Sequence, residues 1–427
     1  MIPTWVMDKP TGAEIGKFLS IDFGGTNLRV VFVDLKGNSK FEFDFIKFKI
    51  PQSVKTAKNN KELFLFICDA IQYFFKIKSI NLLLLEPGEK MPMGFTFSFP
   101  VTQNAINQGE LQKWTKGFDI RGIENSDIVA MLQGTLNEYD LPVNVVSVIN
   151  DTTGTLIASM YSDPNTIMGL VFGTGVNGAY FEKIENIEKL KGILPTDIIE
   201  DGYMAINCEF GAFDNAVAFL PVTEYDIQIN RNSENPNQQC YEKLISGYYL
   251  GEIVRLILVD CHAKGLIFKD QDTAKLMIKN ILDASFLSEV EKDSYYDLES
   301  TYDIVIKTLH IASVFEERNL IQKICLLVGS RAARLSACAI AGVMLQSGNK
   351  SGDCAIDGSV FNKYTGFKEK VEEALKEIFN WRGDSKKRPI SLKSAEDGSG
   401  AGAAIIACLT KERLDKGKSV GRLNKSI

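Results

Sequence analysis

Hydrophobic and polar positions in the opening part of the chain alternate in the way that packed β-strands do. Residues 18–35 predict two strands around a tight turn, since Gly24-Gly25 stands between two apolar runs and is a strong hairpin signal. A third strand is expected over roughly residues 40–50. Residues 61–78 then show helical periodicity, which predicts a helix after the first three strands.

Apolar runs continue this pattern in the middle of the chain. Residues 93–101 form an apolar run that ends among a serine and a proline, and residues 143–149 are apolar and β-branched. Both runs predict buried strands. Between them, residues 125–138 predict a helix with Asn125 or Ser126 as its cap.

The second half of the chain repeats the arrangement. Residues 167–182 again predict a strand, a glycine turn and a strand, and Gly173-Thr174-Gly175 matches Gly24-Gly25-Thr26 in its chemistry. The two halves therefore look like an ancient duplication. Helices are expected to fill residues 270–345, and a final helix is expected over Ala403–Lys411. Strands that alternate with helices indicate an α/β protein.

Bulk properties narrow the class of protein. A chain of 427 residues is longer than one core usually serves, so two domains are expected. The net charge of −6 argues against a nucleic-acid binder and does not suggest a membrane surface. The basic run Lys386-Lys387-Arg388 is interpreted as a solvated loop. No apolar run reaches the roughly 18 residues of a membrane span, and Met1–Trp5 do not resemble a signal peptide.

Cysteine and histidine usage excludes several chemistries. The 8 cysteines are scattered singly, without metal-like spacing, which indicates small core residues in a reducing compartment. His262 and His310 are the whole supply of histidine. A Ser-His-Asp or Cys-His nucleophile, or a His-rich metal site, is therefore not expected. Acid–base chemistry is therefore expected to rely mainly on the carboxylates of Asp and Glu.

One carboxylate stands just past the strand expected over residues 143–149. Asp151 occupies the place where open α/β sheets bind their ligands, and Thr152–Gly154 are expected to form a loop that lets backbone approach a ligand. We interpret Asp151 as a general base that works on a sugar hydroxyl. The alternative is an aspartate that caps a following helix through its side-chain oxygen. This stretch alone leaves both interpretations open.

The first glycine turn carries groups that suit a phosphate. Glycine lets backbone N–H groups crowd around a phosphate, and Thr26, Asn27 and Arg29 add further donors. An aspartate beside a phosphate is repulsive unless a cation intervenes, so Asp22 implies Mg²⁺ reached through water. The alternative is a plain hairpin. One such turn is weak evidence, whereas two around a post-strand aspartate indicate a nucleotide held between two domains.

Three other stretches have residue patterns that suit ligand binding. Residues 114–118 place Trp and Phe around Thr115-Lys116, which suits a ligand-lining loop better than an exposed one. Residues 328–333 open a run of small residues that allows close packing or a flat ligand. Residues 396–402 form a glycine-rich helix start, which is either an anion or nucleotide-edge site or a close-packed turn.

The chain resembles the hexokinase family, and the fungal glucose-phosphorylating type in particular. The resemblance spans essentially the whole chain, in family order. Its segments are IPTWVMDKPTG, FLSIDFGGTNLRVV, GFTFSFPVTQN, LQKWTKGFDI, VVSVINDTTGTL, GLVFGTGVNGAY, AINCEFGAFDN, NPNQQCYEKLISGYYLGEIVR, GSRAARLSACAIAG, AIDGSVFNKYTGFKEK and AEDGSGAGAAIIA.

The resemblance implies a two-lobed, actin-like ATPase (ribonuclease H-like) α/β fold with a sugar and nucleotide cleft between two domains. The small domain would comprise residues 17–150 and 397–427, and the large domain residues 1–16 and 151–396. The implied activity is ATP-dependent phosphorylation of the 6-hydroxyl of D-glucose, and also of fructose and mannose, with ATP and Mg²⁺. This first step of glycolysis would run in the cytoplasm, in a monomer or weak homodimer without nucleic acid or a membrane span.

Matched residue by residue, the resemblance implies Asp151 as the catalytic base. The sugar site would be lined by Asp151 with Ser98, Thr115, Lys116, Asn150, Asn177, Glu209, Gln239 and Glu242. The nucleotide would contact Asp22, Phe23, Gly24, Gly25, Thr26, Asn27, Arg29, Lys47, Thr174, Gly247, Tyr248, Ser330, Arg331, Ala332, Ala333, Arg334, Ser399, Gly400, Ala401, Gly402 and Ala403. Asp22 would reach the nucleotide-bound Mg²⁺ through water.

Two departures from the family pattern stand out. Family members usually carry several dozen residues before the motif with which this chain begins. Asn237 stands where the family usually has glycine, and asparagine tolerates the left-handed conformation better than other non-glycine residues. We therefore expect the loop before Gln239 to keep its shape with modest strain.

Two other classes of protein compete with an active enzyme. A catalytically silent sugar sensor on this fold would be expected to lose Asp151, Lys116 or a glycine of the phosphate turn, and none is lost. A filament-type or chaperone-type ATPase would not need Thr115-Lys116 and Asn150-Asp151. An assay with glucose and ATP separates the three classes.

Overall fold

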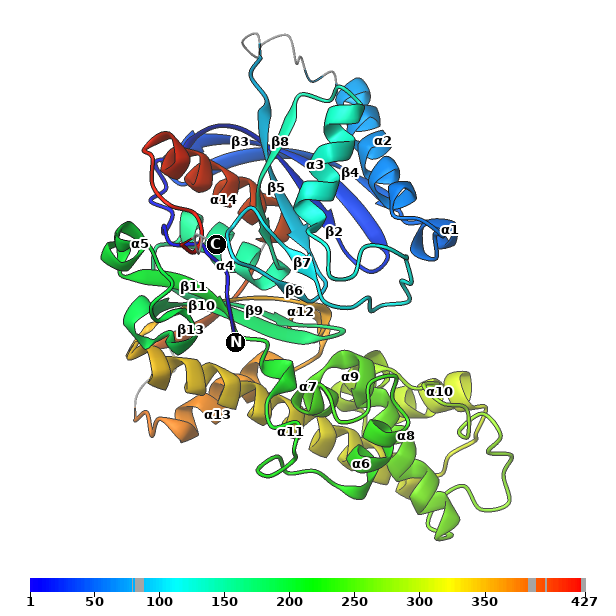
Figure 1. The fold of residues 1–427 in the computed structure, drawn as a ribbon. Coiled ribbons are helices and arrows are strands. Elements are labelled where there is room, and N and C mark those ends of the chain that lie inside the picture. Colours follow the sequence, from blue (N-terminus) through cyan, green and yellow to red (C-terminus); the bar gives the residue numbers. More distant parts are fainter. Residues whose placement is uncertain (79, 81–87, 383–388, 396–397, 424–427) are drawn as a thin grey trace.

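Two β-sheets organise the protein (Figure 1). The computed structural model describes residues 1–78, 80, 88–382, 389–395 and 398–423. The first sheet has the order β4-β3-β2-β5-β8, the second has the order β1-β11-β10-β9-β12-β13, and β6 pairs with β7. The strands are β1 Ile2–Pro3, β2 Ile15–Phe23, β3 Asn27–Gly37, β4 Lys40–Lys49, β5 Met91–Phe97, β6 Val101–Thr102, β7 Glu110–Leu111, β8 Val143–Ile149, β9 Thr166–Phe172, β10 Val176–Lys183, β11 Tyr203–Asn207, β12 Gly352–Asp357 and β13 Ile390–Ser394.

The two sheets share one pattern of strand pairing. In the first sheet, β4, β3 and β2 are antiparallel neighbours, and the parallel strands β5 and β8 follow. In the second sheet, β11, β10 and β9 are antiparallel neighbours, and the parallel strands β12 and β13 follow. The repeated order agrees with the predicted duplication. The hairpins expected over residues 18–35 and 167–182 are confirmed.

Helices cover the first sheet on both faces. Helices α2 and α3 enclose one apolar core against it, while α14 and α4 belong to a second core that continues to the other sheet (Figure 1). The helices are α1 Gln52–Lys55, α2 Lys61–Ile77, α3 Ile128–Glu138, α4 Asp151–Ser162, α5 Thr196–Asp201, α6 Glu224–Arg231, α7 Cys240–Ile245, α8 Gly247–Ala263, α9 Ala284–Lys292, α10 Glu299–Leu309, α11 Phe315–Ser347, α12 Ser359–Lys363, α13 Phe367–Ile378 and α14 Gly398–Asp415.

Helix α14 approaches its neighbours backbone to backbone. A Cβ atom on Gly402 would lie 2.0 Å from the carbonyl oxygen of Gly154 in α4, and one on Gly94 in β5 would lie 2.1 Å from the carbonyl oxygen of Ala403. Only glycine permits such separations. The glycine-rich start of α14 is therefore a close-packed element. Close packing was one of the two alternatives predicted for it, the other being an anion or nucleotide-edge site.

Several local expectations were wrong. Helix α3 is capped by Asp127, whose carboxylate accepts hydrogen bonds from two backbone N–H groups, rather than by Asn125 or Ser126. Residues Thr152–Gly154 belong to the first turns of α4 and not to a loop. Residues 270–283 form turns rather than helix, and α14 is longer than expected. Lys386-Lys387-Arg388 and the proposed boundary at Asp397 lie outside the described residues.

Helix α11 also departs from the expectation that no segment would be long and apolar enough for a membrane span. By length and composition it meets that test, with a mean hydropathy of 1.5 over its best window. However, 56% of that window is buried inside the protein, where α11 packs against α7, α8, α9 and α13. A core helix passes the same test, so α11 is weak evidence for a span.

Candidate functional site

The carboxyl end of β8 presents Asn150 and Asp151 together. Asn150 is the cap of α4, because its side-chain oxygen accepts hydrogen bonds from the N–H of Thr153 at 3.0 Å and from its hydroxyl at 2.5 Å. Asp151 is the first helical residue, and its carboxylate accepts the N–H of the adjacent Thr152 at 2.8 Å. The alternative interpretation of Asp151 as the helix cap is therefore wrong.

The surroundings of Asp151 favour a basic carboxylate. Burial raises the pKa of Asp151 above its ordinary value, and the negative charge of Asp357 raises it further. The positive charge of Lys116 and the N–H of Thr152 act in the opposite direction. A carboxylate with a raised pKa accepts a proton more readily than an exposed one while it is ionised.

Lys116 projects from a loop that is held by aromatic residues. Trp114 and Phe118 are each 6% exposed, and they stack on each other and pack against Phe99. The sequence favours a ligand-lining loop at this place, and the two aromatic side chains anchor that loop in the core. The residues between them, Thr115 and Lys116, are exposed. The aromatic residues therefore fix the position of the loop, and its exposed polar residues are accessible to a ligand.

The Lys116 side chain reaches across to the end of β5. Its ammonium donates a hydrogen bond of 2.5 Å to the carbonyl oxygen of Ser98 and lies 5.1 Å from the ring centre of Phe99. The N–H of Ser98 in turn donates to the carbonyl oxygen of Phe23. The backbone of Lys116 has a φ of 59°, in the left-handed region. Ser98, Lys116 and the end of β2 are thus brought together.

The second sheet contributes an amide-carboxylate network. Glu209 Oε1 accepts hydrogen bonds from the side-chain amides of Asn177, at 3.0 Å, and Asn207, at 2.7 Å. The same Asn177 amide also donates to Asn207 Oδ1 at 2.9 Å. The side-chain oxygen of Asn177 accepts the N–H of Glu209 at 3.0 Å. Because one carboxylate oxygen takes both amides, the other is left for a ligand.

Asn207 was missed in the sequence, although its bonds orient Glu209. It is a buried polar residue at the end of β11, directly before the segment Cys208-Glu209. Buried polar side chains are hydrogen-bonded, so an asparagine two residues before a carboxylate could have been recognised as its partner. Asp357 was missed as well, because its influence on Asp151 comes from a strand far along the chain.

Helix α7 adds a second carboxylate to this network. Glu242 Oε2 accepts the N–H of Val176 at 2.9 Å. Burial raises the pKa of Glu242, the negative charge of Glu209 raises it further, and the N–H of Val176 and the charges of Lys116 and Lys243 lower it. The charge of Lys116 lowers the pKa of both Asp151, at the start of α4, and Glu242, on α7, so these three side chains face one region.

The loop before α7 keeps its expected shape. Asn237 has a φ of 59° and Gln239 a φ of 53°, so both lie in the left-handed region, as Glu209 does with a φ of 49°. Asn237 is also held by two hydrogen bonds with Asn230. Gln239 Oε1 lies so close to Gly211 that a Cβ atom there would be 2.4 Å away. The asparagine in place of the usual glycine is therefore accommodated.

The turn between β2 and β3 packs against the Lys116 loop. Neither Gly24 nor Gly25 has a positive φ, so the glycines are not required by the turn geometry. A Cβ atom on Gly25 would instead lie 2.9 Å from Cδ of Lys116.

At the end of β2, Asp22 Oδ2 accepts a hydrogen bond of 2.7 Å from the Ser399 hydroxyl. Arg29 on β3 lies over the Phe45 ring at 4.7 Å.

The second glycine turn is built in a similar way. The carbonyl oxygen of Gly173 accepts the N–H of Gly247 at 2.8 Å, and a Cβ atom on Gly175 would lie 2.8 Å from Glu242 Oε2. Thr174 at its tip is exposed, as is Tyr248 at the start of α8. The turn therefore touches both the carboxylate network and the start of α8.

Two segments expected to contact the nucleotide, residues 330–334 and 399–403, are only partly accessible. Ala332 and Ala333 are fully buried, and Arg331 and Arg334 are engaged in ion pairs with Asp226 and Glu377; Ser330 is half-buried. In the segment 399–403, Ser399 is half-buried and the other four residues are buried. On the first sheet, Lys47 is exposed and lies directly across from Arg29.

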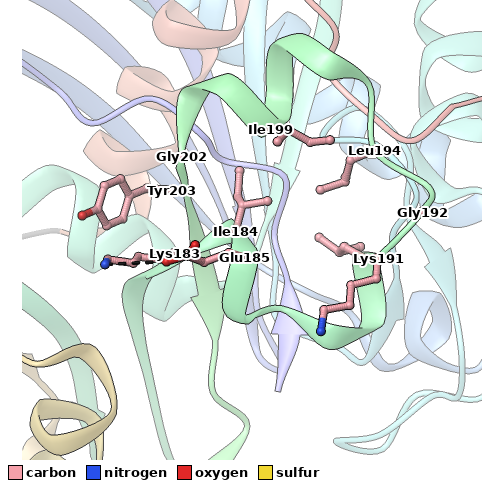
Figure 2. A pocket seen from close by; sticks show the side chains of 10 residues that line it. Lys183, Ile184, Glu185, Lys191, Gly192, Leu194, Ile199, Gly202 and Tyr203 are labelled. Atoms are coloured by element: carbon pink, nitrogen blue, oxygen red, sulfur yellow. Dashed lines mark ion pairs between the residues drawn. The ribbon is translucent and has the colours of Figure 1, made fainter.

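A separate hollow of about 570 Å³ lies away from these residues (Figure 2). The segment between β10 and β11 lines it, with apolar side chains such as Ile184, Leu194 and Ile199 and with Lys183 and Glu185 at its edge. None of the expected site residues belongs to its lining. This hollow is therefore separate from the expected site residues.

Comparisons with known proteins agree along the whole chain. Two family models, both described as hexokinase, match residues 1–161 and 167–409. Hexokinase-1 of Saccharomyces cerevisiae is 49% identical over 421 residues, which are 99% of this chain and 86% of that protein. Hexokinase of Kluyveromyces lactis is 50% identical over 422 residues, with the same coverage of 99% and 86%. The solved structure of a hexokinase from Schistosoma mansoni complexed with glucose matches with a TM-score of 0.82 at 32% identity, over 96% of this chain and 88% of that one.

Proposed function

The chain belongs to the hexokinase family, with its actin-like fold, and from this premise we propose how its residues divide the reaction. Its activity is the ATP-dependent phosphorylation of a hexose, a glycolytic reaction. The identity of about half of all residues along nearly the full length carries this conclusion. The finer assignments below rest on the geometry of the site.

A hexose would lie between the two sheets, in the region that Lys116 shares with Asp151 and Glu242. A sugar is covered with hydroxyl groups, so its site needs paired acceptors and amide donors. Glu209 and Glu242 are half-buried carboxylates beside an amide network, and a polyhydroxyl ligand would use their acceptor oxygens better than a packed core does. The proposed sugar site consists of Ser98, Thr115, Lys116, Asn150, Asp151, Asn177, Glu209, Gln239 and Glu242.

Asp151 is the proposed general base. The 6-hydroxyl oxygen of the hexose attacks the γ-phosphorus of ATP, the bond from this phosphorus to the β,γ-bridging oxygen breaks, and the hydroxyl proton passes to Asp151. Phosphoryl transfer asks the protein mainly for positioning, charge neutralisation and one base. The raised pKa of Asp151 suits that base, and Lys116 supplies a positive charge beside it.

The nucleotide phosphates would meet the two glycine turns. Support comes from the exposed hydroxyls of Thr26 and Thr174 and from the guanidinium of Arg29 on the first turn. Ser330, Ser399, Tyr248 and the ion-paired Arg334 are accessible members of the segments proposed for the rest of the nucleotide.

The residues present fit a Mg²⁺ ion that arrives with the nucleotide. The described residues hold no group of three or more His, Cys, Asp or Glu side chains suited to a metal. Mg²⁺ in kinases is bound through one or two carboxylates together with substrate phosphates and water, and a single carboxylate at the phosphate turn meets that need. Asp22 would hold it through water, and when bound the ion would neutralise phosphate charge.

The domain division follows the two sheets. We assign residues 17–150 and 397–427 to the small domain and the remaining residues, 1–16 and 151–396, to the large domain. This division is supported by the first sheet, whose strands come from residues 15–149, and by β1, which pairs with β11 in the second sheet. We further propose glucose as the main substrate, with fructose and mannose also accepted, and a monomer or weak homodimer.

The proposed compartment is the cytoplasm. All 8 cysteines are free, and six of them are buried. Burial raises the pKa of thiols such as Cys325 and Cys354, which keeps them protonated and unreactive. Unpaired, inert cysteines are typical of proteins in a reducing compartment.

The proposed activity is tested with purified protein, glucose, ATP and Mg²⁺. We expect hexose 6-phosphate to form, detected by coupling to its dehydrogenase, and we expect little ATP hydrolysis without sugar. The same preparation is tested for glucose binding by calorimetry. Binding without turnover would identify a silent sugar sensor. ATP hydrolysis that ignores glucose would instead indicate an ATPase of another type on this fold.

Trp114 should report sugar binding. It is buried, its indole N–H donates to the carbonyl oxygen of Ile120 at 3.1 Å, and it directly precedes Thr115 and Lys116. A ligand that moves those residues is expected to change its fluorescence, whereas Trp5 and Trp381 lie outside the sugar segments. Titration with glucose should therefore change the intrinsic emission, and Trp114→Phe should remove most of that change. An undiminished signal in the variant would show that this loop does not meet the sugar.

A further inference from the structure

Lys55, which has no role in the site described above, holds the phosphate turn. It is the last residue of α1 and is half-buried. Its ammonium donates a hydrogen bond of 2.6 Å to the carbonyl oxygen of Gly25, in the turn between β2 and β3. A hydrogen bond from a charged donor is stronger than one between neutral groups, and partial burial protects it from screening by salt.

The same lysine also contacts the loop proposed for the sugar. Its backbone carbonyl oxygen accepts the N–H of Asp119 at 2.8 Å, and its ammonium lies 5.3 Å from the ring centre of Phe118. Gly25 meets this loop from its other side, where it packs against the side chain of Lys116. Lys55 therefore joins the phosphate turn to the sugar loop through both its side chain and its backbone.

The contact with Gly25 fixes more than one atom. A trans peptide unit is planar, so its carbonyl group and the following N–H point in opposite directions. By holding the Gly25 carbonyl oxygen, Lys55 sets the direction of the Thr26 N–H, which is one of the backbone donors proposed for the phosphates. A shift of the loop 115–119 on sugar binding would be passed to this donor through Lys55.

We propose that Lys55 is a positioning residue that couples occupancy of the sugar loop to the geometry of the phosphate turn. This inference rests on the proposed function. It does not require Lys55 to touch either substrate. It predicts that sugar and nucleotide each strengthen the binding of the other, and that this mutual effect depends on the Lys55 ammonium.

The test measures this coupling. The dissociation constant for glucose is determined by calorimetry with and without saturating MgADP, and KM for ATP is determined by the coupled assay. In Lys55→Met, which keeps the apolar stem, we expect KM for ATP to rise about tenfold and the effect of MgADP on glucose affinity to disappear. The affinity for glucose alone should change less than about twofold, because no sugar contact is removed. Lys55→Arg should restore most of the coupling.

Controls separate this role from a general loss of structure. Lys58→Met alters an exposed lysine just after α1 and should leave both measurements unchanged. Melting transitions are compared for all variants, and Lys55→Gln is made in parallel so that a folded protein without the ammonium is available. If wild type turns over glucose but Lys55→Met and Lys55→Gln keep its KM for ATP and its coupling, the inference is overturned. If wild type shows no turnover, the proposed function itself fails.

Discussion

Replacing Asp151 with asparagine is expected to lower kcat by at least roughly a hundredfold, since general bases typically contribute about 10²–10⁴-fold. Asparagine is nearly isosteric and still hydrogen-bonds the 6-hydroxyl, so the dissociation constant for glucose should change by less than about tenfold, or 1.4 kcal/mol. Asparagine cannot take the proton, and it removes a negative charge beside the attacking oxygen. Turnover and glucose binding are measured on the same preparation, with its melting transition.

The pH dependence of kcat provides a second measurement of this role. A general base works only when it is ionised, and burial raises the pKa of Asp151, the proposed base. The acid limb of the wild-type profile should therefore lie at a higher pH than the ordinary range of aspartate, and the variant should lack it. Asp163→Asn, at the other end of α4, is the matched control and should retain wild-type turnover. A fall in kcat of less than about tenfold in Asp151→Asn would mean that Asp151 is not the base.

Changing Glu209 should weaken sugar binding more than it weakens the fold. Glu209→Ala removes an acceptor from a desolvated site, a loss of about 1–3 kcal/mol, which corresponds to a rise in KM for glucose of roughly 5–150-fold. Glu209→Gln is the sharper variant. Its remaining oxygen can still accept the amides of Asn177 and Asn207, but an NH₂ group then replaces the acceptor on the ligand side. We expect kcat to fall as well, because a misplaced sugar reacts poorly.

A buried carboxylate elsewhere supplies the control for Glu209. Glu182 at the end of β10 is buried and accepts hydrogen bonds from Tyr180, Lys183, Asn186 and Gln346. Glu182→Gln should affect the melting transition but leave KM for glucose unchanged. If Glu209→Gln also keeps the wild-type KM while its melting temperature falls, Glu209 is a structural carboxylate, and the proposed sugar site is wrong on this side.

Local sequence signals were sufficient for much of the fold. Both glycine hairpins and the strand before Asp151 are predicted by apolar runs and by turn residues that lie next to them in the chain. The left-handed backbone at Asn237 agrees with the expectation drawn from the family's usual glycine at this position and from the tolerance of asparagine for that conformation. These features depend on interactions between neighbours in the sequence, and such interactions can be read without knowing the rest of the structure.

Features that depend on distant partners could not be predicted. The loop that carries Thr115 and Lys116 was expected to line a ligand, but the way it is held, by packing of Trp114 and Phe118 against Phe99, is not visible in its own sequence. The influence of Asp357, at the end of β12, on Asp151, at the start of α4, joins residues from both halves of the chain. The need for glycine at position 25 lies in the approach of Lys116 rather than in the turn itself. In each case the decisive neighbour is far away in sequence.

Three residues of the proposed sugar site, Lys116, Glu209 and Gln239, hold a left-handed backbone although none is glycine or asparagine. Such a conformation costs each residue roughly 1–2 kcal/mol relative to an ordinary one. Replacing these residues with glycine would relieve the strain in the backbone and so raise the melting temperature. Each replacement would delete a side chain proposed to meet the sugar. Selection for thermal stability and selection for turnover consequently oppose each other at these three positions, and an engineer seeking a more durable enzyme should leave them alone.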